Sequence, residues 1–392
     1  MMKEPEKAPQ RLWNANYVTF LSMQTLFYLM LYLTFPILPK YALSVGIELS
    51  DAGLLSGVLF VASVSSRFVT GSCIDRMRRD RILLVSLLVS GLTTMAIALT
   101  DKFWVLLMLR FLYGCSFAFF TTTVTSCAAD TIPQEHMAEG ISYFGVGIAV
   151  AAAVGPATSL ALYDWIGGIM TFVIAGGISL LCVLCLFFAS INERRSATDK
   201  SQQGSSFPIT RLIEPRAVLF ALLVIPITFC NGFVNSFIPL TADERHISGI
   251  GVFFTVFAVT MMVLKPLSGK MQDRTGLASV LVPAFICMTA SACIISFAQT
   301  LWLMIIAALL LAFGQGAGQP ALLSSCAMVG GKERRGVALS TYYLGMDVGL
   351  GIGNVTGAQV AHALGFTKAY LMCAAMLAIG LIVFLTTKHK HS

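Results

Sequence analysis

Apolar residues in this chain come in twelve blocks of helix length, separated by short polar segments. A helix needs about 20 mostly apolar residues to cross the ~30 Å of bilayer hydrocarbon. Because a helix satisfies every backbone polar group internally, it can span lipid where irregular chain cannot. The pattern predicts an all-α membrane protein with twelve transmembrane helices. The blocks run over 17–39, 51–73, 82–100, 103–128, 137–163, 167–190, 216–240, 248–270, 277–298, 300–328, 336–362 and 366–387.

One polar stretch, 192–215, divides the blocks into two sets of six. It contains ERRS, TDKSQQGSS and two prolines, which are typical of a linker. We therefore expect a six-helix bundle over 1–191, a cytoplasmic linker over 192–215 and a second six-helix bundle over 216–392.

An internal repeat also indicates two halves. The segment Gly71-Ser-Cys-Ile-Asp75-Arg76 follows the second block, and Gly269-Lys-Met-Gln-Asp273-Arg274 follows the eighth, 198 positions later. Arg67 matches Lys265 at the same offset, and Gly140 matches Gly336 at an offset of 196. Parallel six-helix halves are typical of transporters whose substrate site lies between the halves.

Charge is sparse and unevenly distributed. The chain is 57% hydrophobic and 11% charged, which leaves no room for a sizeable soluble domain. Of its 26 Lys and Arg residues, nineteen fall toward one side of the alternating blocks and three lie deep inside blocks. Four fall toward the other side, at Lys40, Lys102, Arg245 and Lys368. By the positive-inside rule, both termini and the linker lie in the cytoplasm of a multi-pass protein of the cell (inner) membrane.

Several functional classes lack support in the sequence. The net charge of +7 resides in short loops and tails, so it does not imply nucleic acid. Most of the ten cysteines lie in apolar blocks, where Cys behaves as a small hydrophobe. We expect no metal site, since Cys182 and Cys185 form a lone CxxC without a second ligand pair. There is no GxxxxGK[ST] loop and no catalytic constellation, so neither an enzyme nor a cofactor is expected.

The repeated Gly-x-x-x-Asp-Arg stretch resembles motif A of the major facilitator superfamily. Arg110-Phe-Leu-Tyr-Gly114 is similar to motif B of that family. The segment from Gly147 to Gly155-Pro156 resembles motif C, which is associated with antiporters, although alanine replaces several of its glycines. The first motif A copy has Arg78 where a glycine is usual, and the second lacks the closing basic pair.

The resemblance implies two pseudo-symmetric bundles, transport by alternating access, and a gating role for motif A. In the family this cluster latches the outward-open state, with Asp75 facing the start of the 336–362 block. A small residue lets helix ends approach closely, and an Asp is stabilised at a helix N-terminus. The alternative is a topology determinant in a solvated loop. The gating residues expected are Gly71, Asp75, Arg76, Arg79, Asp130, Gly269, Asp273 and Arg274.

Four charged residues lie well inside the blocks, away from their ends, where charge is costly and is a functional candidate. Arg67 and Lys265 lie close enough to the cytoplasmic loops to snorkel. Arg110 lies ~12 Å in from the outer end of its block and is a candidate for contacting an anionic group or a nearby proton site. Asp347 lies ~16 Å deep and is the best proton carrier, because a buried carboxyl takes up a proton readily. Alternatively, Asp347 is satisfied by hydroxyls or amides and only packs helices; a direct Arg110–Asp347 pair is not expected.

Polar residues also recur four apart in three blocks that line the central cavity in this superfamily. Residues four apart share a helix face, so each pair presents one polar face. These faces indicate a substrate lining, and the alternative is interhelical hydrogen bonding worth ~0.6 kcal/mol each. The candidates are Gln24, Tyr28, Tyr32, Asn231, Asn235, Gln315 and Gln319, together with Arg110.

The leading hypothesis is a monomeric, proton-coupled secondary transporter that exports a small organic compound. The chain resembles the drug and metabolite efflux branch of that family in two segments, Phe35-Pro36-Ile-Leu-Pro39 and Thr341 to Asp347. Its partners would be a small-molecule substrate, protons and the lipid bilayer. One alternative is proton-coupled uptake of a sugar or organic acid. Another is a membrane receptor or scaffold that does not transport.

Overall fold

The computed structural model describes residues 12–47, 49–188, 213–331 and 333–389, and they are helical almost throughout. Most of the predicted linker and the two chain ends lie outside these ranges. The long helices are α1 (Ala15–Ser44), α2 (Leu49–Arg76), α3 (Arg79–Ile97), α4 (Phe103–Thr131), α5 (Met137–Phe188), α6 (Val218–Glu244), α7 (Gly251–Thr275), α8 (Leu277–Phe297), α9 (Leu301–Val329), α10 (Arg335–Leu364) and α11 (Phe366–His389).

Twelve helical segments confirm the expected all-α membrane fold within the described residues. Helix α5 is two segments that meet at Gly167, whose φ of 82° only glycine adopts readily. This break falls where the sequence predicted a boundary between two blocks. Eleven segments are long and apolar enough to cross a membrane. Helix α10, with 30 residues, has ample length to do the same.

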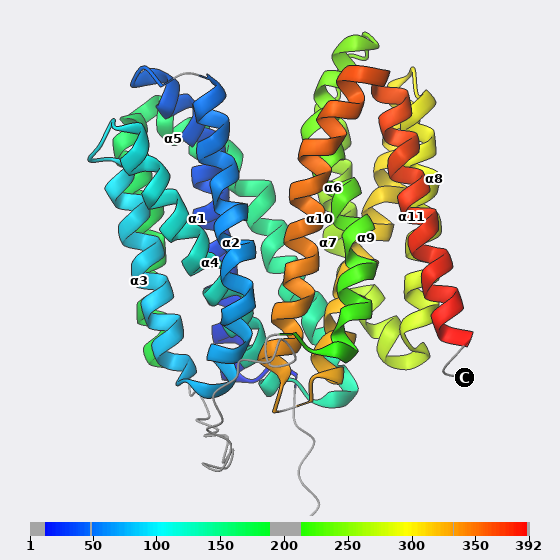
Figure 1. The fold of residues 1–392 in the computed structure, drawn as a ribbon, viewed down its shortest axis with the longest axis horizontal. Helices are drawn as coiled ribbons and strands as arrows, with labels where there is room; N and C mark the ends of the chain where they lie inside the picture. The colour runs from blue at the N-terminus through cyan, green and yellow to red at the C-terminus, as the bar shows by residue number, and fades with distance from the viewer. Residues whose placement is uncertain (1–11, 48, 189–212, 332, 390–392) are drawn as a thin grey trace, which may run out of the picture.

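The helices form two bundles, α1–α5 and α6–α11, which stand side by side (Figure 1). Each bundle has its own hydrophobic core: Phe27, Phe120 and Phe144 lie in the first, and Phe229, Phe285 and Tyr370 in the second. Because few core residues cross between the bundles, they can move relative to each other without exposing either core.

Large apolar side chains cover the outside of both bundles. Trp104, Trp165 and Trp302 are 73%, 83% and 76% exposed, which suits contact with lipid rather than with water. Trp104 and Trp302 lie near the starts of α4 and α9 and are 198 positions apart, the offset of the motif A copies. The repeat therefore extends to the residues that face the membrane.

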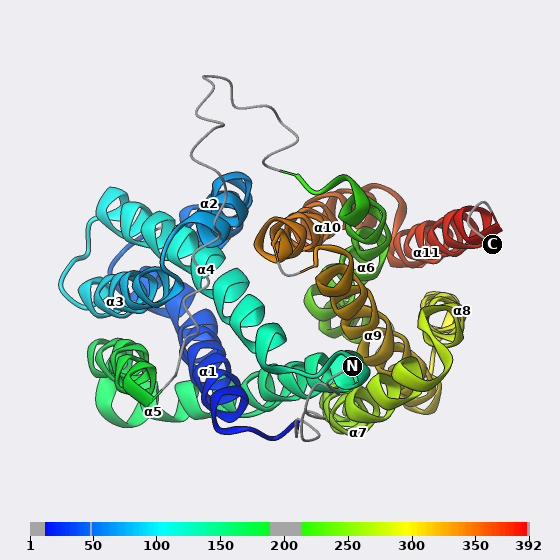
Figure 2. The ribbon, with the colours of Figure 1, turned by 90° about the horizontal axis from the view of Figure 1, so that it is seen from below.

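The bundles meet at one end, the face that carries segments 76–79, 131–137 and 329–335, which we call the basic face. There α2 packs on α10 and α5 packs on α7 (Figure 2). Toward the opposite face the ribbons of the two bundles diverge (Figure 1). Helix α1 begins at the basic face, where the Asn14 side chain donates to the Thr131 carbonyl at the end of α4.

Glycines allow the two helix pairs at the basic face to approach closely. A Cβ atom on Gly71 would lie 2.7 Å from the Cα of Val337, and one on Gly269 would lie 2.6 Å from the carbonyl oxygen of Ala138. Both distances are too short for a side chain. The sequence match of Gly140 with Gly336 is off by two positions, since Gly336 corresponds in space to Ala138, again 198 residues apart.

Replacing Gly71 with valine should push α2 away from α10 and open the basic face. The opposite ends of the bundles should then come closer by several ångströms. Exposed Lys102 and Lys368 can be replaced by p-acetylphenylalanine and spin-labelled, and double electron–electron resonance would then measure this distance. Gly57→Val is the control, because a Cβ at Gly57 on the same helix meets nothing within 4 Å. An unchanged distance in Gly71→Val, or an equal change in the control, would contradict the role of close packing.

Candidate functional site

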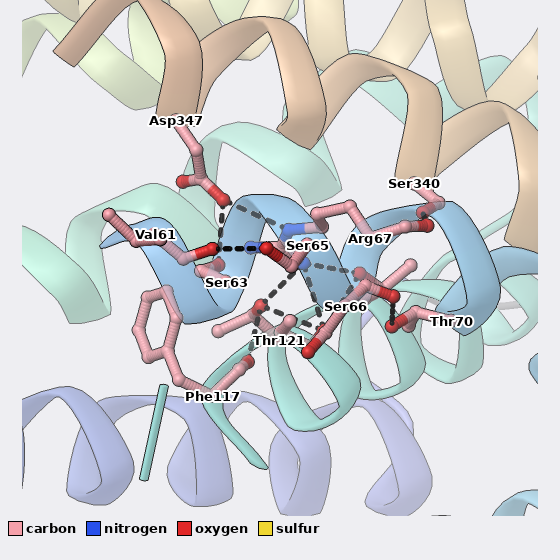
Figure 3. Close-up of polar contacts among 12 residues, drawn as sticks. Val61, Ser63, Ser65, Ser66, Arg67, Thr70, Phe117, Thr121, Ser340 and Asp347 are labelled. Carbon is pink, nitrogen blue, oxygen red and sulfur yellow. Dashed lines mark hydrogen bonds and ion pairs between the residues drawn. The ribbon is translucent and has the colours of Figure 1, made fainter. Parts of the chain in front are cut away.

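A buried ion pair joins the two bundles deep within the helices. Arg67 of α2 donates from Nε to a carboxylate oxygen of Asp347 of α10 at 3.1 Å, and the Ser63 hydroxyl donates to the same oxygen at 2.7 Å (Figure 3). Arg67 and Asp347 are each 1% exposed. The pair compensates two opposite charges, one from each bundle, that would be costly to bury separately.

Contacts from α4 and α10 fix the Arg67 side chain. Its Nη1 donates to the Ala118 carbonyl at 2.9 Å and to the Thr121 hydroxyl at 3.0 Å. Its guanidinium lies 4.7 Å from the centre of the Tyr343 ring, within the range of a cation–π contact. The expectation that Arg67 snorkels to the loops is wrong, because α4 and α10 supply its partners at depth.

Lys265 of α7 also stays inside the protein, and its expected snorkelling is likewise wrong. It is 6% exposed, and its ammonium donates to the Gly145 carbonyl of α5 at 2.8 Å. This hydrogen bond crosses between the bundles, as the Arg67–Asp347 pair does. The repeat thus places a cation at the α5–α7 contact and another at the α2–α10 contact.

A cavity of about 70 Å³ lies between the bundles beside these contacts. Such a volume holds a few waters or one polar head group, and it is smaller than the ~300 Å³ or more of a drug-sized pocket. Both bundles contribute side chains to it. The lining residues are Gln24, Tyr28, Ile141, Phe144, Gly145, Ile148, Lys265, Gln319, Pro320, Leu323, Tyr342, Tyr343 and Met346.

Three predicted lining residues, Gln24, Tyr28 and Gln319, border this cavity. Gln24 is 2% exposed, its amide donates to the Phe144 carbonyl at a long 3.4 Å, and its side-chain oxygen has no hydrogen-bond partner among the described residues. The Tyr342 hydroxyl donates to the Gln319 backbone carbonyl at 3.0 Å and holds α10 against α9.

The other predicted lining residues do not border this cavity. Tyr32 lies one turn beyond Tyr28, with the two rings 6.4 Å apart. Gln315 lies one turn from Gln319 and is buried, and its side-chain oxygen also lacks a partner in the described part of the chain. Asn231 is half-buried on α6; Asn235 lies on the same helix, and its side chain is outside the described residues.

Arg110 lies within the first bundle, away from the ion pair. It is 1% exposed, its Nε donates to the Leu55 carbonyl of α2 at 3.3 Å, and its guanidinium lies 5.1 Å from the Tyr113 ring centre. Asp347 bonds Arg67 and not Arg110. The sequence pattern did not predict Arg67 as the partner of Asp347.

Two aspartates close the basic face from the two halves. The Asp75 carboxylate accepts from the backbone N–H groups of Gly336 and Val337 at 3.0 and 3.2 Å, at the start of α10. Asp273 accepts from those of Ala138 and Glu139 at 3.0 and 2.9 Å, at the start of α5. Each carboxylate satisfies the unpaired amides of a helix N-terminus in the other bundle, where the helix dipole also favours negative charge.

Asp130 adds a third link. Its carboxylate pairs with Arg79 of its own bundle and with Arg335 of the other. Motif residues Arg76 and Arg274 are exposed, and among the described residues no ion pair involves them. Of the motif A arginines, Arg79 thus pairs with Asp130, and Arg335, which the sequence did not single out, supplies the second cation.

Glu139 links the α5–α7 side of the basic face in a similar way. It pairs with Lys270 of α7 at 3.3 Å and with His136 at 3.1 Å. Ligand atoms of His136, Glu139 and Asp273 lie within 4.8 Å of one another. Since both carboxylates already bind amides or cations, the cluster serves as a charge network.

The residues that resemble motif C pack α5 on α1. A Cβ on Gly155 would lie 2.6 Å from the Cβ of Tyr32, and one on Gly147 would lie 2.2 Å from the Thr25 hydroxyl oxygen. Pro156 follows directly and is half-buried within α5. Close contact between α5 and α1 thus brings Gln24 of α1 near Phe144 of α5.

Comparison with known proteins agrees with this architecture. The family model of the Major Facilitator Superfamily matches residues 20–253 and 220–392. The Multidrug resistance protein MdtG of Salmonella typhi is 24% identical over 357 residues, covering 88% of both chains, and the same values hold for MdtG of Citrobacter koseri. The matches confirm the resemblance to that superfamily seen in the sequence.

Solved structures share the fold. The human organic anion transporter MFSD10 (TETRAN) has a TM-score of 0.82 at 16% identity, covering 96% of this chain and 100% of that one. The fucose:proton symporter FucP of E. coli has a TM-score of 0.79 at 16% identity, covering 95% and 98%. At such identities the likeness concerns the fold alone.

The ion pair predicts a non-additive mutant cycle. Arg67→Gln leaves the Asp347 carboxylate buried with only Ser63, which should destabilise the protein by about 3–5 kcal/mol. Adding Asp347→Asn removes the stranded charge, so the double variant should recover most of the lost melting temperature in detergent. Lys40→Gln, which removes an exposed ion pair with Asp164, serves as control and should change little. A double variant at least as unstable as Arg67→Gln would contradict the coupling.

Proposed function

The chain belongs to the major facilitator superfamily, and we propose on that premise that it exports a small organic compound in exchange for protons. It is a multi-pass membrane transporter and not an enzyme. The relatives named as multidrug resistance proteins support export, and the Arg67–Asp347 pair between the bundles supports coupling to protons. That ion pair is the observation on which the proposal depends most.

In this proposal the basic face lies in the cytoplasm of the cell membrane. The positive-inside rule supports this orientation, with both termini and the 192–215 linker on the same side. The structure then represents the outward-facing state, because the bundles are joined at the basic face. One chain supplies both bundles and the cavity between them, so the transporter works as a monomer.

Asp347 is the proposed proton site because neutralising it would break the bond between α2 and α10. A protonated Asp347 no longer attracts Arg67 as an ion, and the guanidinium keeps its bonds to Ala118 and Thr121 within its own bundle. Binding of a proton from outside would thus weaken the contact between α2 and α10 that helps to keep the basic face closed. Proton release to the cytoplasm would restore the pair and favour the outward-facing state.

Asp75 and Asp273 act as the two latches of the cytoplasmic gate in this cycle. Each carboxylate makes two hydrogen bonds to the opposite bundle, and all four must break when the gate opens. Bonds to charged groups contribute about 1.5–3 kcal/mol each. The latches therefore set the balance between the two states, while Asp347 shifts that balance with proton binding.

The proton role of Asp347 can be tested in proteoliposomes that contain the pH dye pyranine. A panel of anionic, neutral and cationic aromatic dyes should include one that drives proton movement in the opposite direction. Asp347→Asn should abolish this proton movement and retain dye exchange without net transport. Asp164→Asn, an exposed acid on the other face, is the control and should behave as wild type.

Three results would contradict the proposed function. Unchanged proton movement in Asp347→Asn would remove this residue from coupling. Protons that move in the same direction as the dye would favour the uptake alternative. Absence of both dye exchange and proton movement for every dye would favour a receptor or scaffold.

The latch role of Asp75 predicts a separation of turnover from binding. Asp75→Asn removes the charge at the start of α10, which should shift the balance between states by roughly tenfold or more. Turnover should fall accordingly, while the dissociation constant of a transported dye changes by less than about threefold. Asp80→Asn, which affects an exposed pair with Arg78 near the same face, is the matched control. Equal losses of turnover and affinity would count against gating.

A further inference from the structure

The repeat places Lys265 where the first half has Arg67, but it supplies no acid to match. Arg67 and Lys265, Asp75 and Asp273, and Gly336 and Ala138 are each 198 positions apart and make corresponding contacts. At this offset Asp347 corresponds to Ala149. Deep in the helices, the α2–α10 contact therefore pairs a cation with a carboxylate, whereas at the matching depth of the α5–α7 contact the described residues supply only the cation.

Within the described residues, no carboxylate lies within ion-pair distance of Lys265. The one hydrogen bond that its ammonium makes to the described part of the chain is to the neutral Gly145 carbonyl, at 2.8 Å. An ammonium has three donors, so two remain for other partners. Burying an unpaired charge is costly, and proteins normally compensate it with an opposite charge. A cation at this depth thus points to a partner that is not part of the chain.

The cavity beside Lys265 offers further hydrogen-bond donors and no acid. The Tyr28 hydroxyl and the Gln319 side-chain amide both border it, and neither makes a hydrogen bond within the described part of the chain. Gln24 adds an amide that is held only by its long 3.4 Å bond. The cavity volume of about 70 Å³ fits a carboxylate or sulfonate group, and the rings of Tyr342, Tyr343 and Phe144 line the cavity.

We propose that Lys265 forms an anion subsite that binds the negatively charged head group of the transported compound. This inference rests on the proposed function and specifies its substrate class as amphipathic organic monoanions. The carboxylate or sulfonate of the substrate occupies the position that Asp347 holds at the other contact. Gln24, Gln319 and Tyr28 donate hydrogen bonds to it, and the apolar body of the substrate extends away from the 70 Å³ cavity.

The Lys265–Gly145 hydrogen bond makes the anion affinity of this subsite depend on the conformational state. When the basic face is closed, the Gly145 carbonyl holds the ammonium and competes with an anion for it. When α5 and α7 separate, the ammonium loses that partner and binds an anion more strongly. The affinity is therefore higher toward the cytoplasm and lower in the outward-facing state, as export requires.

The test compares three probes of similar shape and different charge, naphthalene-2-sulfonate, 2-naphthamide and 2-naphthyltrimethylammonium. Titration calorimetry on the purified full-length protein should give the sulfonate an affinity at least about tenfold above that of the amide. Lys265→Gln should remove this preference and leave amide binding unchanged. Lys265→Arg should keep part of the preference, and Lys40→Gln should keep all of it.

Four results would overturn the subsite: equal affinity for sulfonate and amide, preference for the cation, binding of none of the three, or a sulfonate preference that survives Lys265→Gln. If Lys265→Gln does not purify as a monodisperse protein, Gln319→Leu replaces it and should weaken only sulfonate binding.

Proton-coupled export of the cationic probe alone would overturn the subsite and leave the proposed function intact. A failure of the Asp347 test would overturn the proposed function and leave the order of probe affinities unchanged.

Discussion

A charge inside a bilayer needs a partner at its own depth, and this constraint explains where the two bundles touch. Arg67 finds Asp347 on the opposite bundle, and Lys265 finds a backbone carbonyl there. Because both contacts cross between the bundles, the arrangement that satisfies the charges is also the arrangement that closes the basic face. The same two contacts therefore compensate the buried charges and hold the two bundles together at the basic face.

Two kinds of contact hold the bundles together, and they differ in chemistry. At the basic face, Asp75 and Asp273 bind helix N-termini, whose amides and dipoles do not change during transport. Deeper in the helices, the contact between Arg67 and Asp347 joins two full charges that are both buried. The first kind of contact offsets the partial charges of two helix ends, and the second offsets two full charges inside the protein.

The sequence predicted the helices and the repeat, because hydrophobic block length and the repeated motif depend on local chemistry. It missed the Arg67–Asp347 pair, since block length gives the depth of a residue but not its neighbours. A signal was available: motif A brings α2 to α10, and Arg67 and Asp347 lie ~12 and ~16 Å from that contact. Lys265 was missed as a lining residue because its distance from the loop allowed snorkelling, and only the packing of α5 on α7 excludes it.

Asp130 binds one arginine from each bundle, Arg79 from its own and Arg335 from the other. If the bundles separated there, the carboxylate would keep Arg79 as its partner, while Arg335 would be left to water at the membrane surface. Separation thus exchanges one ion pair for hydration instead of isolating a negative charge. An interface with such a shared acid would open at a modest energetic cost, which suits a carrier that must cycle for every molecule it moves.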